Sequence, residues 1–128
     1  MKTVTTPKEY QHSSPAGAEV RLLMNNSHGG IAHCTLKNKK TSHAVRHKTV
    51  SEFWHILSGK GEIWRKNNNA ESVTILEPGI TIDIELGTTF QYRSIDGDLT
   101  FICVTTPPWP GHDEVFYVEN GKWEATVS

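Results

Sequence analysis

Hydrophobic and polar residues alternate with a period of two along most of the chain. The clearest case is 80–85, where isoleucine occupies every second position and threonine, aspartate or glutamate the others. This alternation predicts a strand with one buried face. Further segments with strand-like composition lie at 19–24, 31–36, 52–57, 62–65, 72–76, 89–93 and 99–104. Many short strands without an amphipathic helix predict an all-β sandwich or barrel.

Turn-forming residues separate these segments. Asp96-Gly97, Asn120-Gly121 and the run 58–61, which contains two glycines, are expected to be hairpin turns. The segment 99–104 is apolar on both faces, so we expect a central strand buried on both sides. Residues 1–18 show no period and contain Pro7, Pro15 and Gly17, which predicts an N-terminal arm followed by a single domain over 19–128.

Composition narrows the classes of function. The chain has 128 residues, with 13 basic and 14 acidic side chains that are scattered along it. We therefore expect no nucleic-acid partner. No apolar run is long enough to span a membrane and the start lacks the apolar core of a signal peptide, so a cytoplasmic protein is expected. Cys34 and Cys103 lie in apolar strands, which favours buried free thiols.

The segment 41–65 carries the residues best suited to chemistry. His47 and Glu52 lie on either side of an expected turn, so pairing of the flanking strands would point both side chains to one face. Alternation puts Trp54 on the same face as Glu52. A histidine beside a carboxylate on a rigid sheet can act as a general acid or base near neutral pH.

The spacing of these residues resembles a known superfamily. His47, Glu52 and Gly59 match the second histidine, the glutamate and the closing glycine of the first motif of small cupins. The segments 76–79 and 87–94 are similar to the second motif of that family and match it only in part. The resemblance implies a jelly-roll cupin barrel, a double-stranded β-helix of the RmlC-like type, with His47 and Glu52 facing its interior. Cupins host many reactions and also non-enzymatic binders, so the resemblance leaves the activity open.

The chain departs from that family at its metal ligands. Val45 and Phe90 stand where the family has two ligand histidines, and Ser94 replaces an asparagine. The remaining candidate ligands are His47 and Glu52, with His43 and His33 as substitutes from nearby positions. Two cofactor states therefore stay open, namely no metal or a divalent transition metal such as Zn, Mn, Fe or Ni.

Aromatic residues around the candidate pair suggest a small-molecule pocket. Tyr92 could donate a hydrogen bond to a substrate oxygen, and we group it with His47 and Glu52 as a catalytic candidate. The proline-rich run 105–114 is expected to close over the barrel mouth. Candidate ligand-binding residues are Val45, Trp54, Phe90, Arg93, Trp109 and Asp113. Such a pocket suits a sugar-like ring or a small cyclic molecule, and Arg93, if turned inward, would favour a carboxylate.

Three functions are consistent with these residues. The first is a small cupin that binds a small polar cyclic molecule and catalyses isomerisation, dehydration or cyclisation by acid–base chemistry of His47 and Glu52. The second is a metal-dependent cupin isomerase or oxygenase. The third is a non-enzymatic metabolite-binding module. By analogy with the family, a homodimer is expected in each case.

Overall fold

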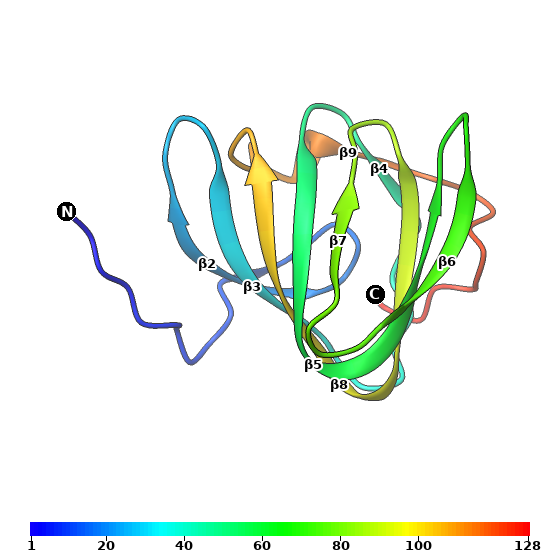
Figure 1. Cartoon of the computed structure of the whole chain (residues 1–128), viewed down its shortest axis with the longest axis horizontal. Coiled ribbons are helices and arrows are strands. Elements are labelled where there is room, and N and C mark those ends of the chain that lie inside the picture. Colours follow the sequence, from blue (N-terminus) through cyan, green and yellow to red (C-terminus); the bar gives the residue numbers. More distant parts are fainter.

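The chain folds into strands with no α-helix (Figure 1). The computed structural model describes all 128 residues. Its elements are β1 (His12–Ser13), β2 (Glu19–Asn25), β3 (Gly30–Leu36), β4 (Val45–His47), β5 (Ser51–Lys66), β6 (Glu71–Leu76), β7 (Thr81–Ile84), β8 (Thr89–Thr106), the 3-10 helix η1 (His112–Glu114) and β9 (Val115–Tyr117). The predicted all-β class is confirmed.

Two long strands build the barrel. The first half of β5 pairs with β7 and with the second half of β8, while the second half of β5 pairs with β6 and with the first half of β8. From β8, one sheet continues through β3, β2 and β1, and the other through β4 and β9. Both sheets curl around a shared interior (Figure 1), so the expected jelly-roll barrel is confirmed.

The expected hairpin turns at 58–61 and Asp96-Gly97 are wrong. Both segments lie inside the long strands, where the pairing of β5 with β8 shifts register between Ile56 and Gly61. Gly59 has a φ of 81°, and a Cβ there would stand against the carbonyl oxygen of Asp98. The glycines therefore allow a bulged bend in which two backbones touch, rather than a reversal of the chain.

Two further expectations fail in the second half of the chain. The segment 99–104 is central, but only one of its faces is buried, because Ile102 and Val104 are half-exposed on the outside of the sheet. Asn120-Gly121 closes no hairpin. Instead β9 pairs with β4, and the tail that follows runs past Thr41, whose carbonyl accepts from the backbone N–H of Thr126.

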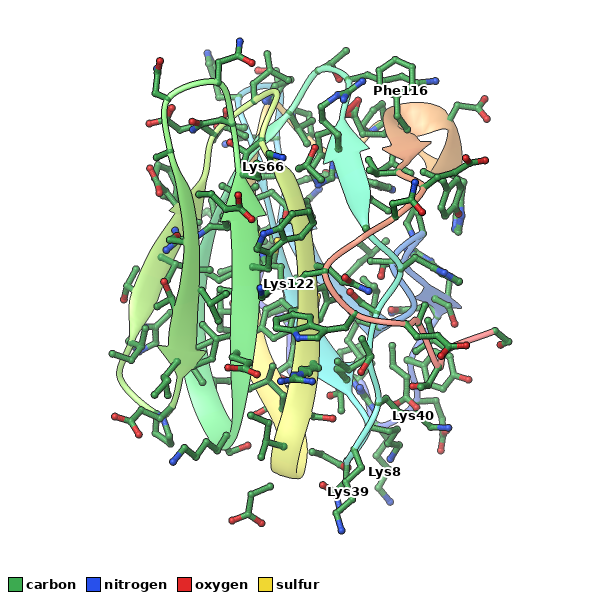
Figure 2. The ribbon with its side chains drawn as sticks, turned by 90° about the vertical axis from the view of Figure 1, so that its right-hand side faces the viewer. Lys8, Lys39, Lys40, Lys66, Phe116 and Lys122 are labelled. Carbon is green, nitrogen blue, oxygen red and sulfur yellow. The ribbon has the colours of Figure 1, made fainter.

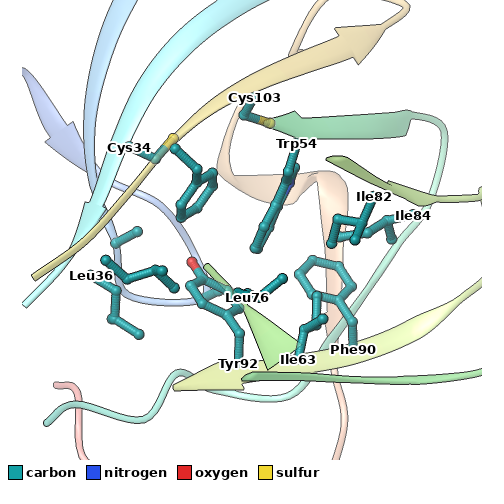
Figure 3. Close-up of a cluster of buried hydrophobic side chains, with 14 of the residues drawn as sticks. Cys34, Leu36, Trp54, Ile63, Leu76, Ile82, Ile84, Phe90, Tyr92 and Cys103 are labelled. Atoms are coloured by element: carbon teal, nitrogen blue, oxygen red, sulfur yellow. The ribbon is translucent and has the colours of Figure 1, made fainter. Parts of the chain in front are cut away.

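The hydrophobic core lies in the barrel interior. Its centre is the indole of Trp54, stacked on Phe101 with 4.0 Å between the ring centroids and packed edge-on against Tyr92. Isoleucine and leucine side chains from β5, β6, β7 and β8 surround these rings (Figure 3). Cys34 and Cys103 are buried free thiols, as expected.

The first 18 residues divide into two parts. Residues 12–18 join the barrel, since β1 pairs with β2 and Ala16 and Ala18 are buried. Residues 1–6 leave the barrel wall (Figure 1) and make no backbone hydrogen bond, and Lys2 and Val4 border the outer end of the interior cavity. Between the two parts, the guanidinium of Arg21 donates to the carbonyls of Pro7 and Lys8.

The homodimer stays a prediction, and the free arm supplies its test. Residues 1–6 are rich in threonine and include Val4, so they can add a strand to an exposed edge of a second copy. We expect deletion of residues 1–6 to weaken self-association at least about tenfold, measured by sedimentation equilibrium. The double substitution of Lys37 and Lys39 by alanine, at an exposed turn, serves as the control. A full chain that sediments as a monomer would contradict the prediction.

Candidate functional site

His47 lies between two buried carboxylates. Its Nε2 is 3.2 Å from Glu52 Oε2, and its Nδ1 is 3.5 Å from Glu114 Oε2 without making a hydrogen bond. All three side chains are nearly inaccessible to solvent. Burying ionisable groups is costly unless they pair or hydrogen-bond, and here each of the two carboxyl groups has the imidazole of His47 as a neighbour.

The expected pair of His47 and Glu52 forms, but for a different reason. Their strands do not pair with each other. β4 pairs with the first half of β8 and with β9, while the start of β5 pairs with the second half of β8 and with β7. The two side chains therefore come from different sheets and meet across the barrel interior. The turn 48–50 between β4 and β5 sets their separation.

Glu114 was missed in the sequence, which pointed instead to Asp113. Glu114 Oε2 accepts from the backbone N–H groups of Lys48, Thr49 and Val50, at 3.0, 2.8 and 3.2 Å, and Oε1 accepts from the Thr49 hydroxyl. Burial raises the pKa of Glu114, but these hydrogen bonds and the nearby His47 outweigh it and leave the pKa below its ordinary value. The ionised carboxylate thereby fixes the turn that carries His47 and Glu52.

The pair opens onto a cavity of about 450 Å³ inside the barrel. The structure brings together here most of the predicted ligand-binding residues. The cavity is lined, among others, by Val45, His47, Glu52, Trp54, Phe90, Tyr92 and Trp109. The ring of Phe90 stacks on His47 and that of Trp109 meets it edge-on, each with centroids 5.5 Å apart. Trp109 comes from the proline-rich loop, which reaches the cavity as expected.

Two polar groups that carry no charge, the Tyr92 phenol and the Cys103 thiol, also line the cavity. Burial raises the pKa of Tyr92 well above its ordinary value, and the neighbouring Cys34 and Glu52 raise it further. A hydrogen bond with Cys34 and burial likewise raise the pKa of the Cys103 thiol. Both groups therefore stay protonated at neutral pH. Tyr92 can donate a hydrogen bond from its phenol, which fits the role suggested for it.

Four predicted site residues lie elsewhere. Arg93 points out of the barrel, where it pairs with Glu62 and covers the ring of Trp123. Asp113 is exposed on η1. His43 packs against Tyr117, with ring centroids 5.9 Å apart. His33 is absent from the cavity lining, and burial and the charge of Arg21 lower its pKa. By the period-two alternation of a strand, Arg93 and His33 belong to the faces opposite Phe90 and Cys34, which agrees with these positions.

Comparison with known proteins identifies the architecture. No family model matches the chain, and no curated protein matches it. Solved structures do. They include oxalate decarboxylase from Bacillus subtilis (TM-score 0.75, 12% identity, 92% of this chain and 33% of that one) and KdgF from Halomonas sp. (0.65, 12%, 77% and 87%). The CENP-C cupin domain of Drosophila melanogaster also matches (0.62, 15%, 70% and 65%). The chain has the cupin fold.

At these identities the likeness shows the cupin fold alone. The chain spans only 33% of the oxalate decarboxylase chain and 65% of the CENP-C one, so nothing of their activity is transferred. The structure contains no helix with the length and apolar character that a membrane crossing requires.

The cupin fold raises the question of a metal, and the side chains do not fit one. Val45 and Phe90, in place of two family ligands, are cross-strand partners and both are buried. His43 and His33 lie away from His47 and Glu52, and no three His, Cys, Asp or Glu side chains gather in a metal-binding arrangement. His47 and Glu52 supply two donors, whereas transition-metal sites in proteins usually have three or more. The donor set therefore falls short of such a site.

Proposed function

We propose that this cupin-fold protein binds a small cyclic molecule in its cavity and that His47 and Glu52 move a proton on it. One observation carries the proposal: a histidine held between two buried carboxylates forms part of the wall of an aromatic cavity. A buried ionisable cluster beside a pocket is a common feature of catalytic sites. The aromatic wall supplies the apolar surface that most small-molecule sites use.

The geometry suits acid–base chemistry. Isomerisation, dehydration and cyclisation each take a proton from one atom and return it to another. His47 Nε2 and Glu52 Oε2 are close enough to exchange a proton with each other, and both groups face the cavity. Trp54 Nε1–H donates to Glu52 Oε1 at 2.9 Å and fixes the carboxylate. Tyr92 can donate from its phenol to a ligand oxygen and so hold it in place.

A metal-independent binding module is the second candidate, because the same cavity can hold a metabolite without turnover. Proton exchange separates the two functions. Small cyclic ketones, alcohols and sugars are screened for binding by ligand-observed NMR in D2O. Deuterium appearing on carbon atoms of a bound compound then reports proton transfer. Binding without deuterium incorporation would leave the binding module and rule out the proposed catalysis.

We expect His47→Gln to slow deuterium incorporation at least about 100-fold while the compound still binds, because general acid–base groups contribute factors of this size. The rate of exchange is measured by NMR at saturating compound. His55→Gln is the matched control, since His55 is exposed and its Nδ1 meets Thr81 on the outer face. Equal rates in His47→Gln and in the unsubstituted protein would remove His47 from the chemistry.

A further inference from the structure

The cavity is almost free of cationic side chains. All lysines are exposed, and those labelled in Figure 2 project from the outside of the barrel. Lys2, on the extended arm, is the one lysine that reaches the outer end of the lining, where His12 and His112 also lie. The four arginines all have partners elsewhere: Arg21 with Pro7 and Lys8, Arg46 over Phe116, Arg65 with Asp83, and Arg93 with Glu62.

This distribution works against an anionic ligand. Proteins bind carboxylates and phosphates chiefly through arginine, lysine and clustered N–H donors. Besides His47, the strong N–H donor near Glu52 in the cavity is the indole of Trp54. This indole N–H already donates to Glu52. The carboxyl groups of Glu52 and Glu114 flank the single imidazole of His47. An anion in the cavity would therefore lie beside two carboxyl groups and would find no arginine or lysine partner in its deep part.

In the same cavity, Glu52 can accept further hydrogen bonds. Glu52 accepts a hydrogen bond from Trp54 at Oε1, has His47 Nε2 3.2 Å from Oε2 and has the Cys103 thiol as a further neighbour, whereas a carboxylate can accept about four hydrogen bonds. Around it stand the rings of Trp54, Phe90, Tyr92 and Trp109. Electron-rich ring faces and a carboxylate together form the surroundings that stabilise a desolvated ammonium group.

We propose that the cavity takes a ring-bearing amine whose ammonium group donates to Glu52 while its ring packs on the aromatic wall. The proposal rests on the proposed small-molecule function and names its ligand class. It replaces the carboxylate that an inward-facing Arg93 would have favoured, because Arg93 lies outside the barrel.

Three probes with one skeleton test it. Benzylamine, benzyl alcohol and benzoate are titrated into the full chain near neutral pH by calorimetry. We expect benzylamine to bind at least about tenfold more tightly than benzyl alcohol, because hydrogen bonds to charged groups are the stronger ones, and benzoate to bind weakest. The indole N–H resonance of Trp54 should shift with benzylamine, since this group shares Glu52 with the ammonium.

Substitution then assigns the preference to one carboxylate. Glu52→Gln should reduce the advantage of benzylamine over benzyl alcohol to about twofold or less, and Glu85→Gln, which removes an exposed carboxylate, should leave it intact. If Glu52→Gln does not fold, the three-probe comparison and the Trp54 resonance decide alone. Benzyl alcohol or benzoate binding as tightly as benzylamine would overturn the amine preference and leave small-molecule binding standing. Failure of all three to bind would count against both proposals.

Discussion

Replacing Gly59 with alanine is expected to destabilise the barrel by more than about 3 kcal/mol, and a large part of the protein should fail to fold. Gly59 sits at the bend of β5, where its Cα lies against the backbone of β8. A Cβ would collide with the carbonyl oxygen of Asp98, which cannot move without breaking the pairing of the two long strands. Because the pairing of β5 with β8 runs through both sheets, a shift of the backbone at Gly59 would disturb both of them.

Gly97→Ala separates this collision from the cost of backbone conformation. Gly97 has a φ of 80°, nearly equal to the 81° of Gly59, but nothing lies within 4 Å of its Cβ position. We expect Gly97→Ala to cost only about 1 kcal/mol, the usual penalty for alanine in the left-handed region. Urea unfolding followed by circular dichroism measures both. Similar losses in the two variants would mean that the close approach at Gly59 contributes nothing.

The bulge at these glycines could not be predicted from the sequence, whereas the burial of several side chains could. Period-two alternation assigned Glu52 and Trp54 to one face and the isoleucines of 80–85 to another buried face. Of these, Glu52, Trp54, Ile82 and Ile84 are buried and Ile80 is half-buried. Alternation reports burial, which is a local property. Two glycines in a strand-like segment are compatible with a turn and with a bulge, and which of them forms depends on the strand that lies opposite. That partner is β8, about forty residues further along the chain.

The candidate site shows the same division. The motif spacing predicted His47 and Glu52 as site residues, and Phe90 and Tyr92, which lie two positions apart in one strand, line the same cavity. Glu114 escaped because its role depends on contacts with residues 48–50, more than sixty positions earlier. In the sequence Asp113 and Glu114 are equivalent acidic neighbours. Only the path of η1, which exposes the first and buries the second, distinguishes them.

Glu114→Ala is expected to cost about 3–5 kcal/mol of stability and to abolish proton exchange on a bound compound. The change removes the acceptor of the Thr49 and Val50 backbone N–H groups, and it leaves the buried donor of Val50 without a partner. It also takes away the carboxylate that faces His47 Nδ1. The turn 48–50 then loses its fixed shape, and His47 and Glu52 lose their relative position. Urea unfolding and the deuterium-exchange rate measure the two effects.

The pH dependence of stability distinguishes the charge of Glu114 from its shape. Because its pKa in the folded state is below its ordinary value of 4.5, the unfolded chain takes up the proton first as the pH falls. The stabilisation is therefore complete above about 4.5 and is lost as the pH drops through the lower, folded-state pKa.

Glu114→Gln keeps the size and one acceptor oxygen but cannot titrate. We expect it to lower the free energy of unfolding at neutral pH and to flatten its fall below pH 4.5, measured by urea titration across that range. Glu119→Gln, at an exposed position without a side-chain partner, should leave the fall of the free energy of unfolding at low pH unchanged. If the free energy of unfolding falls as steeply with decreasing pH in Glu114→Gln as in the unsubstituted protein, the carboxylate holds the turn by its shape rather than by its charge.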